Sequence, residues 1–285
     1  LRDIRRRISG TVGLVPTMGY LHKGHMSLVE YAHRENDTVI ATIFVNPTQF
    51  AAGEDLSSYP RDLPRDLQML ESADVDYVFI PTPEMMYPDG FQTYVTVEHV
   101  TQGLEGAERD GHFRGVATVV NKLFNLTQPD IAYFGQKDAQ QVVVIRQMVR
   151  DLNIPIEIAV CPILREPDGL AMSSRNIYLS EEERKAATTL YRAIQAIGEA
   201  YLVGERHPDK LLTIGKGMIH AEPLAELNYM SLTYPDTLQV VVEATDKPML
   251  LSTAVKVGKP RLLDNSLLPM SLNNRENASK ILGVG

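Results

Sequence analysis

The chain is poor in cysteine and has no long apolar run. Cys161 is its one cysteine, so an internal disulfide is excluded and a reducing compartment, the cytoplasm, is expected. Because Cys161 lies in the apolar run 156–164, we expect a buried structural thiol rather than a reactive one. The longest apolar run, residues 39–45, is far too short to cross a bilayer, so no membrane partner is expected.

The chain also lacks an excess of positive charge. Its formal net charge is −8 and its hydrophobic content is 44%, values typical of an acidic globular protein. The acidic balance argues against a nucleic-acid partner and against a tRNA-charging enzyme. It still permits a local basic pocket for a phosphorylated small molecule.

Three familiar fingerprints of nucleotide and acyl-transfer enzymes are absent. The sequence contains no Walker lysine loop, no Gly-x-Gly-x-x-Gly dinucleotide motif and no Gly-x-Ser-x-Gly nucleophile elbow. With the single cysteine expected to be buried, nothing resembles a covalent nucleophile with its base. If the protein uses ATP, we expect a substrate rather than the protein to attack it.

Strand-like and helix-like stretches alternate through the first 164 residues. Runs rich in Val, Ile and aromatic residues predict strands, and stretches of helical spacing lie between several of them. This alternation predicts an α/β fold with a Rossmann-like, largely parallel sheet. The predicted strands are 11–17, 38–45, 77–81, 94–98, 131–135 and 156–164, and the predicted helices are 25–34, 65–72, 116–126 and 139–152.

The pattern changes after residue 174. Ser180 followed by three glutamates is typical of a helix start, which predicts a long helix to about Tyr201. A second helix is predicted over 208–220, strands over 238–243 and 249–257, and a loose polar tail from Ser266. We therefore predict two domains, a Rossmann-like domain over 1–176 and a smaller α+β domain over 177–285.

The most informative segment, residues 16–25, directly follows the first predicted strand. His22 and His25 stand there with Gly19 and Gly24, where a strand would pass into a helix. In an open α/β sheet this position binds phosphate groups, because the helix start presents backbone N–H groups and a partial positive charge. Imidazoles can also donate hydrogen bonds to a polyphosphate or protonate a leaving oxygen. The segment therefore predicts a nucleotide site.

Three further polar clusters each come after a predicted strand. They span residues 46–49, 135–141 and 172–175. Parallel strands end at the same edge of a sheet, so we expect these clusters and the histidine segment to converge on one ligand.

The side chains of the clusters suit a triphosphate and a polar substrate. Lys137 and Arg175 could neutralise phosphate charge, and Asp138 could hold a ribose hydroxyl or a magnesium shell. Gln49 and Gln141 offer uncharged amides that can bind hydroxyl or carboxylate groups.

Each motif taken alone has a plainer interpretation. His22 and His25 could be metal ligands, although no third ligand of suitable spacing follows, or two unconnected surface histidines. Lys137 with its neighbour could be a solvated helix start, and Arg109 could be solvated in its charged loop. The ordered conjunction of the motifs favours a nucleotide-dependent enzyme, and no protein-bound metal site is expected.

Taken together, the motifs resemble those of the pantothenate synthetase family, from about residue 11 to Asn265. That family belongs to the nucleotidyltransferases with a His-x-Gly-His signature, which are related to class I aminoacyl-tRNA synthetases. The matching motifs are Pro-Thr-Met-Gly-x-Leu-His-x-Gly-His at 16–25, Phe-Val-Asn-Pro-x-Gln-Phe at 44–50, Tyr-Pro-Arg at 59–61, Tyr-Pro-Asp-Gly at 87–90, Leu-Glu-Gly at 104–106, Gly-His-Phe-Arg-Gly at 111–115, Gln-Pro-Asp at 128–130, Gly-x-Lys-Asp at 135–138 and Ser-Ser-Arg-Asn at 173–176.

The resemblance implies roles for individual residues. His25 would be the acid that assists pyrophosphate departure, and the other implied catalytic residues are His22, Lys137 and Arg175. Gln136 stands where many family members have glutamate. The implied ATP-binding residues are Met18, Gly19, Tyr20, Leu21, His22, Lys23, Gly24, His25, Gly135, Gln136, Lys137, Asp138, Leu164, Met172, Ser173, Ser174 and Arg175, and those implied for pantoate and β-alanine are Gln49, Gln141, Asn46 and Arg109.

The resemblance also implies the reaction. Pantoate and β-alanine would be joined to pantothenate with ATP and Mg²⁺, through pantoyl adenylate, releasing AMP and pyrophosphate. The protein would be a cytoplasmic homodimer whose C-terminal domain acts as a lid. Two alternatives are a nucleotidyltransferase acting on a phosphate substrate, disfavoured by the neutral Gln49 and Gln141, and a silent nucleotide sensor, disfavoured by the intact His22 and His25.

Overall fold

The chain folds into two compact units, which a computed structural model describes over residues 2–51 and 53–283. The N-terminal unit comprises Leu1–Gly135 and Gln140–Cys161, and the C-terminal unit comprises Gln136–Ala139 and Pro162–Gly285. This division differs from the predicted one at 176/177. Residues 162–176 belong to the C-terminal unit, where Arg165 pairs with Asp264.

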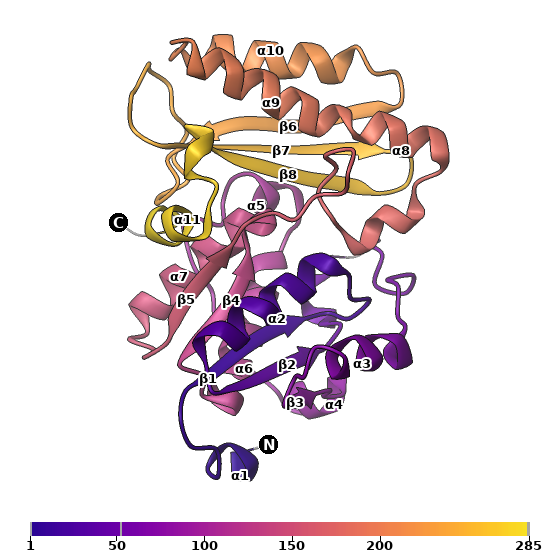
Figure 1. Ribbon diagram of the computed structural model, residues 1–285, viewed down its shortest axis with the longest axis vertical. Helices are drawn as coiled ribbons and strands as arrows, with labels where there is room; N and C mark the ends of the chain where they lie inside the picture. Colours follow the sequence, from indigo (N-terminus) through magenta and orange to yellow (C-terminus); the bar gives the residue numbers. More distant parts are fainter. Residues whose placement is uncertain (1, 52, 284–285) are drawn as a thin grey trace. The chain divides into compact units, whose positions relative to one another are not determined.

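The N-terminal unit is built on five parallel strands (Figure 1). They lie in the order β3-β2-β1-β4-β5, so the chain leaves β1 toward one edge and later returns to its other side to form β4. The predicted Rossmann-like parallel sheet is confirmed. The strands are β1 (Val12–Thr17), β2 (Thr38–Ile43), β3 (Tyr77–Phe79), β4 (Ile131–Gly135) and β5 (Glu157–Cys161).

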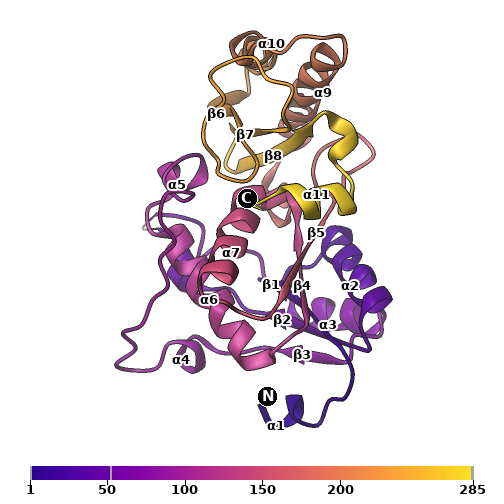
Figure 2. The same ribbon diagram turned by 90° about the vertical axis from the view of Figure 1, so that its left-hand side faces the viewer.

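Helices cover both faces of this sheet (Figure 2). On one face, α2 (Lys23–Glu35) and α3 (Leu63–Glu71) bury a core that contains Cys161, which confirms the predicted buried thiol. On the other face lie α6 (His112–Thr127) and α7 (Ala139–Asp151). The short helices of this unit are α1 (Arg2–Arg5), η1 (Pro47–Gln49), α4 (Pro83–Met86) and α5 (Glu105–Glu108).

The predicted strand at 94–98 is wrong. These residues form no sheet pairing within the part of the chain that the structure describes. Instead, Val95 donates its N–H to Thr118 Oγ1 of α6 at 3.0 Å, and the Arg114 guanidinium lies 3.8 Å from the centroid of the Tyr94 ring. The aromatic and β-branched residues that suggested a strand therefore pack on a helix.

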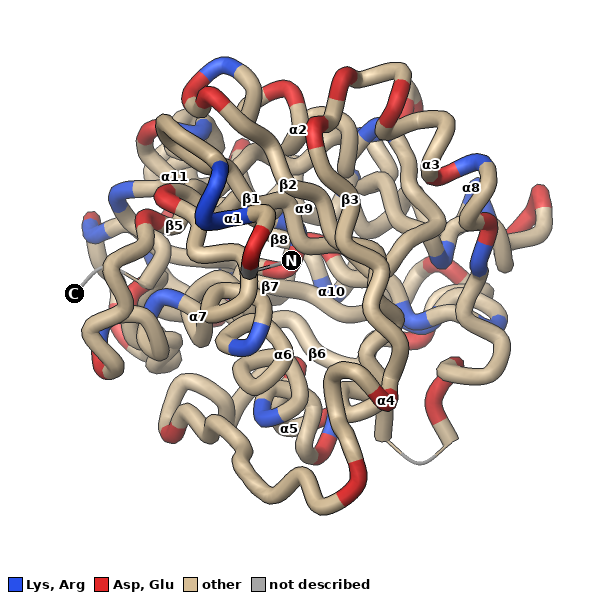
Figure 3. The backbone as a smooth tube through the Cα atoms, turned by 90° about the horizontal axis from the view of Figure 1, so that it is seen from below, with Lys and Arg blue, Asp and Glu red and all other residues tan. Residues whose placement is uncertain are grey.

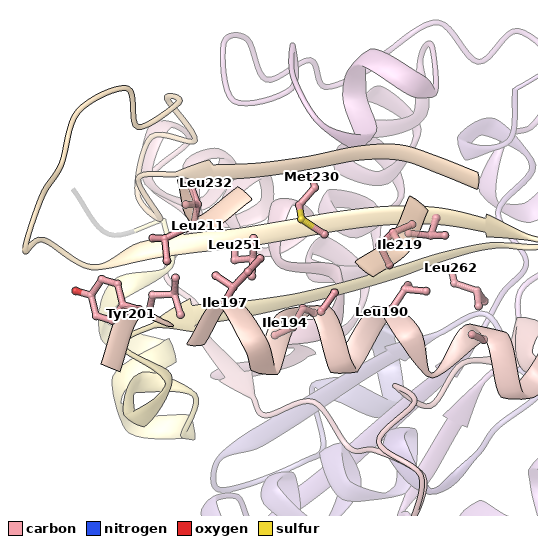
Figure 4. Close-up of a cluster of buried hydrophobic side chains, with 14 of the residues drawn as sticks. Leu190, Ile194, Ile197, Tyr201, Leu211, Ile219, Met230, Leu232, Leu251 and Leu262 are labelled. Carbon is pink, nitrogen blue, oxygen red and sulfur yellow. The ribbon is translucent and has the colours of Figure 1, made fainter. Parts of the chain in front are cut away.

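The C-terminal unit contains a three-stranded antiparallel sheet in the order β6-β7-β8. Its strands are β6 (Ala225–Thr233), β7 (Met249–Val257) and β8 (Arg261–Leu268). Side chains of α9 (Thr189–Leu202) and α10 (Pro208–His220) pack against the strands in a hydrophobic core (Figure 4). The other elements are η2 (Gln136–Asp138), η3 (Ser174–Tyr178), α8 (Glu181–Ala187), η4 (Met270–Leu272) and α11 (Arg275–Ile281).

Two predictions for this unit are wrong in detail. The single helix expected from Ser180 to Tyr201 is interrupted at Thr188, whose Oγ1 donates to the Lys185 carbonyl at 2.7 Å and competes with the helical pattern. The strand expected at 238–243 is absent, because Val240 and Val242 point outward and only Val240 bridges a neighbouring strand. Sequence patterns predicted β7 and α10 but not β6 or β8.

The tail that was expected to be loose from Ser266 is ordered over its described residues. Its first residues complete β8, and η4 and α11 follow. Ala278 and Leu282 are fully buried, so the tail has an apolar face that docks on the unit.

Charged residues are mixed along the elements of both units. Figure 3 shows Lys and Arg interspersed with Asp and Glu in the view from below. Within residues 2–51 and 53–283, no helix is long and apolar enough to cross a membrane.

Candidate active site

Two histidines cap the start of α2. His22 is the N-cap residue, with an extended backbone (φ −142°, ψ 174°), and His25 is the third residue of the helix. His22 Nδ1 accepts a hydrogen bond from the Gly24 N–H at 3.1 Å, and His25 Nδ1 accepts one from the His22 N–H at 3.2 Å. The spacing of the two histidines is thus that of a capping box in which imidazoles replace the usual hydroxyl and carboxylate.

The capping arrangement decides which ring nitrogens carry protons. A nitrogen that accepts an N–H bond has no proton, so the proton of each neutral ring is on Nε2. An imidazolium would carry a proton on Nδ1 as well and would lose its cap bond. Both His22 and His25 are therefore donors through Nε2, the form that suits phosphate oxygens or a developing oxyanion.

A buried carboxylate holds the loop between β1 and α2. Asp66 of α3 is 1% exposed, and its oxygens accept the N–H groups of Tyr20 and Leu21, both at 2.7 Å. Gly19 adopts a φ of +81°, and a Cβ at this position would lie 3.1 Å from the Asp66 carboxylate. Only glycine fits there, so the loop and Asp66 determine one another's position.

The backbone N–H groups of this loop are consequently bonded within the protein. The sequence predicts unpaired N–H groups at the start of the helix, whereas side-chain acceptors take several of the N–H groups in this segment. The N–H groups bonded to side chains are those of Gly19, Tyr20, Leu21, His22 and Gly24.

Asn46 organises the turn that follows β2. Its Oδ1 accepts hydrogen bonds from Thr48 Oγ1 at 2.9 Å and from the Tyr87 hydroxyl at 2.7 Å. Burial is the main cause that raises the pKa of Tyr87, so its hydroxyl keeps the proton that it donates. Asn46 itself is 1% exposed, which suits a residue that holds its neighbours in place.

The other end of the Asn46 side chain orients Gln49. Asn46 Nδ2 donates to Gln49 Oε1 at 3.0 Å, so the Gln49 amide turns its Nε2 to the opposite side, where it lies 3.2 Å from Met18 Sδ. The structure thus brings together Met18, Asn46 and Gln49, which come from the connections after β1 and β2.

Arg109 is held by an acidic partner rather than solvated. Its Nε and Nη2 atoms each donate to the Glu54 carboxylate at 2.7 Å, and its Nη1 lies 3.1 Å from His112 Nε2. His112 Nδ1 in turn lies 2.8 Å from the Gln49 carbonyl oxygen, to which it donates. Arg109 and His112 therefore fix the backbone of Gln49.

The Glu54 carboxyl responds to this pairing. Burial raises the pKa of Glu54, but the hydrogen bonds and the positive charge of Arg109 together lower it by more than burial raises it. The pKa of Glu54 therefore lies below the ordinary value of 4.5. The pair is therefore ionised at neutral pH.

Gln141 lies in the first turn of α7, which follows β4 through η2. β4 pairs with β1, and β1 pairs with β2, so the residues that follow these parallel strands lie at one edge of the sheet. Met18, His22 and Gln49 of the N-terminal unit therefore lie at this carboxyl edge. Gln140, the residue before Gln141, is engaged elsewhere, with its Oε1 accepting the Glu105 N–H at 2.9 Å.

In the C-terminal unit, Asn265 of β8 holds the segment that carries Lys137. Asn265 Nδ2 donates to the carbonyl oxygens of Gln136 and Lys137, both at 2.9 Å. The Lys137 ammonium lies 3.4 Å from the Asp138 carboxylate. The carbonyl groups before and after the Lys137 Cα are thus fixed to a strand.

A second candidate segment is held by the residue before Asn265. Asp264 accepts a two-pronged interaction from the Arg165 guanidinium, at 2.6 and 2.9 Å. Arg165 begins a short hairpin that closes where the Met172 N–H donates to the Leu164 carbonyl at 3.0 Å. Consecutive residues of β8 thus support both groups of implied ATP-binding residues in this unit.

The first serine at the end of the hairpin has a local structural role. Ser173 is the N-cap of η3, and its Oγ accepts the Arg175 N–H at 3.3 Å. Ser174 is buried within η3. The structure therefore gathers the predicted residues into two sets: Met18, Gly19, Tyr20, Leu21, His22, Lys23, Gly24, His25, Asn46, Gln49, Arg109, Gly135 and Gln141 in the N-terminal unit, and Gln136, Lys137, Asp138, Leu164, Met172, Ser173, Ser174 and Arg175 in the C-terminal unit.

No metal-ligating cluster stands in the described part of the chain. Groups of three or more His, Cys, Asp or Glu side chains close enough to hold an ion do not occur among residues 2–51 and 53–283.

Sequence reasoning missed the residues that hold the site in place. Asp66, Glu54, Asp264 and Asn265 act on segments far away in the chain, and nothing in their local sequence indicates those partners. The sequence is compatible with a structural role for His112 as well as with a catalytic one. In the structure, His112 is hydrogen-bonded to the Gln49 backbone.

Comparison with known proteins decides the family. Residues 1–267 match the family model for pantoate–β-alanine ligase. The chain belongs to this family of ligases. It is 58% identical over 268 residues to the pantothenate synthetase of Roseiflexus sp. (strain RS-1), covering 94% of this chain and 96% of that protein. The corresponding protein of Herpetosiphon aurantiacus is 54% identical over 263 residues, covering 92% and 95% of the two chains.

Solved structures of pantoate–β-alanine ligases have the same fold. The pantothenate synthetase of Thermus thermophilus matches with a TM-score of 0.89 at 48% identity, covering 92% of this chain and 95% of that one. The ligase of Francisella tularensis, crystallised in complex with beta-gamma ATP and β-alanine, matches with a TM-score of 0.75 at 37% identity, covering 93% and 94%. The predicted resemblance and fold class are confirmed.

Asp66→Asn tests whether the buried carboxylate holds the ligase's histidine loop. An asparagine places an NH₂ group against one of two backbone donors, so we expect a loss of about 1–3 kcal/mol in unfolding free energy. Urea denaturation measures this. Asp62→Asn on the same helix is the matched control, because asparagine caps a helix as well as aspartate. Equal stability of both variants would contradict the role of Asp66.

Glu54→Gln tests the ion pair with Arg109. Because the folded-state pKa of Glu54 lies below 4.5, the pair stabilises the fold fully above that pH and loses its effect as pH falls through the folded-state value. The unfolding free energy of the wild type should therefore exceed that of the variant by roughly 1 kcal/mol at pH 7. This difference should shrink below pH 4.5. Urea titrations from neutral to acidic pH measure it, with the exposed Glu226→Gln as control. A difference independent of pH would contradict this account.

Proposed function

We propose that the chain ligates pantoate and β-alanine to pantothenate with ATP, through a pantoyl adenylate, releasing AMP and pyrophosphate. Family membership and the relative crystallised with beta-gamma ATP and β-alanine support ATP and β-alanine as substrates. The observation that carries the proposal is the reciprocal capping of His22 and His25 at the carboxyl edge of β1, with the Gln49 amide held beside Met18.

The two imidazoles would act on the phosphates of ATP. In the first step a carboxylate oxygen of pantoate forms a bond to the α-phosphorus, and the bond from that phosphorus to the β-phosphate oxygen breaks. Negative charge then grows on the departing pyrophosphate. A donor already fixed in place stabilises that charge without reorganising, which suits the Nε2–H groups of His25 and His22.

Lys137 and Arg175 would neutralise the remaining triphosphate charge. Both side chains are cations, and the backbone on either side of the Lys137 Cα is fixed by Asn265. The adjoining candidates Asp138, Leu164 and Met172 would complete the ATP site from the same unit.

Pantoate would be bound by neutral amides. Asn46 binds the Gln49 Oε1, so the Gln49 Nε2 points the other way, beside Met18, and would donate to pantoate. Gln141 offers a second amide at the edge of the same sheet. Uncharged donors fit the hydroxyl groups of pantoate, whereas a phosphate acceptor would call for cations. Asn46 and Arg109 act in this proposal by positioning Gln49.

In the second step the amine of β-alanine attacks the activated carbonyl. A carbon–nitrogen bond forms, the bond from the carbonyl carbon to the AMP oxygen breaks, and the nitrogen loses a proton. The protein contributes proximity and charge neutralisation, since no covalent intermediate with the enzyme is involved.

The proposal extends to the cation and to the assembly. Mg²⁺ would enter with ATP and neutralise phosphate charge, held mainly by the phosphates themselves. We also propose a cytoplasmic homodimer, on the resemblance to the family and the buried, reduced Cys161.

Exchange of radioactive pyrophosphate into ATP, with pantoate present and β-alanine absent, tests the adenylate step. Exchange that depends on pantoate is the expected result. His25→Ala and Lys137→Ala should each lower its rate by roughly 10²-fold or more, because each removes a group that meets the developing charge. Exchange without pantoate, or nucleotide transfer to a phosphate acceptor, would contradict the proposal.

A pair of variants at His22 separates helix capping from catalysis. Asparagine is a strong N-cap residue, so His22→Asn should keep the unfolding free energy within about 0.5 kcal/mol of wild type, whereas His22→Ala should lose about 1 kcal/mol. Both should slow pyrophosphate exchange by roughly tenfold or more, since both lack the imidazole donor. Wild-type exchange by His22→Asn would reduce His22 to a helix cap.

A further inference from the structure

We infer that Asn273, in the C-terminal segment 269–283, positions Lys137 for ATP binding through the hydrogen bond that it accepts from Gln136. The inference rests on the proposed role of Lys137 in binding ATP. It assigns a function to a part of the chain that lies beyond residue 267, where the match to the family model ends.

The bond joins η2 to the tail directly. Gln136 Nε2 donates to Asn273 Oδ1 at 2.7 Å and also approaches Asn265 Oδ1 at 3.2 Å. Gln136 is 1% exposed, so water does not compete for this donor. Gln136 immediately precedes Lys137, and its backbone therefore determines where the lysine side chain starts.

Asn265 transmits the constraint to the Lys137 backbone. Its Oδ1 faces Gln136 Nε2, which leaves its Nδ2 directed at the carbonyl oxygens of Gln136 and Lys137. Loss of the Gln136 amide would remove the donor that fixes this orientation. A buried network in which each amide sets the next is sensitive to any one member.

Asn273 is itself rigidly held. Its Nδ2 donates to Ser266 Oγ, to the Leu267 carbonyl and to the Met270 carbonyl at 2.9, 3.0 and 2.9 Å, and its Oδ1 also accepts the Leu267 N–H at 2.8 Å. One side chain thus ties the end of β8, η4 and η2 together.

The tail on which Asn273 stands is anchored on both sides of that residue. Met270 lies over Gly198 of α9, where a Cβ would come within 2.1 Å of the sulfur. Leu282 is fully buried, and the Gly283 N–H donates to the Pro235 carbonyl at 3.0 Å. The acceptor presented to Gln136 is therefore fixed with respect to the rest of this unit.

The direction of this hydrogen bond requires a donor at position 136, and the amide of Gln136 supplies it. Gln136 Nε2 points at two amide oxygens, while its Oε1 is buried without a hydrogen-bond partner among the described residues. A glutamate in this conformation would place a carboxylate oxygen against both acceptors. Gln136 and Asn273 are thus matched to each other in this chain.

The test combines Gln136→Met, Asn273→Ala and the double variant. Gln136→Met keeps the length of the side chain without its donor. We expect each single variant to raise the KM for ATP in pantoate-dependent pyrophosphate exchange about tenfold, the effect of losing one buried hydrogen bond. The KM for ATP of the double variant should be no higher than that of either single one, because each single variant already breaks the bond that joins Asn273 to Gln136. ATP binding by calorimetry without pantoate supplies a readout independent of turnover.

The control is Asn274→Ala. Asn274 is the adjacent residue of the same tail, and its side chain caps α11 by accepting the Asn277 N–H at 2.9 Å. Its removal should leave the KM for ATP within about twofold of wild type, since no bond to η2 is lost. Melting temperatures of all variants show how much folding alone contributes.

The outcomes separate this inference from the function on which it rests. If Lys137→Ala weakens ATP binding but Asn273→Ala behaves like Asn274→Ala, the tail is only structural and the inference is overturned. Additive effects in the double variant would overturn it as well. If Lys137→Ala binds ATP as wild type does, the proposed role of Lys137 fails, and the inference fails with it.

Discussion

The connections that carry the candidate site depend on one constraint: buried backbone N–H and C=O groups must be hydrogen-bonded. Irregular segments at the ends of strands have no ladder to satisfy them. In this protein single side chains from distant elements do so. Asp66 accepts two N–H groups of the histidine loop, and Asn265 donates to two carbonyl groups of the lysine segment. These bonds satisfy backbone groups that no helix or strand ladder reaches.

The constraint divides the polar residues near the site into two kinds. The sequence predicts that Asn46 and Arg109 bind substrate, yet both side chains make several hydrogen bonds within the protein, Asn46 with Gln49 and Arg109 with Glu54 among them. The side-chain amide of Gln49 points in a fixed direction because Asn46 is hydrogen-bonded to it. A polar residue that is deeply buried next to a site is thus more informative about the orientation of its neighbours than about the ligand.

Local patterns were sufficient for the parts of the fold that local interactions decide. A run rich in apolar residues predicted β1, and the segments predicted at 249–257 and 208–220 coincide with β7 and α10. By contrast, β8 was missed because Asp264 and Asn265 interrupt its apolar pattern. Their partners lie 99 and 129 residues away in the chain. The histidine and lysine motifs could be found from sequence because their residue types and spacing are local, whereas the residues that support them could not.

The reciprocal caps of His22 and His25 reverse the arrangement found in phosphate-binding loops of the Walker type. There, backbone amides grip the anion and side chains assist. Here backbone N–H groups at the start of α2 donate to two imidazoles, whose ring centroids lie 4.0 Å apart. Each ring is thus tied to the backbone through its Nδ1, and a rotation of either ring would break a cap bond. The orientation of both imidazoles is therefore set by the first turn of the helix rather than by side-chain neighbours alone.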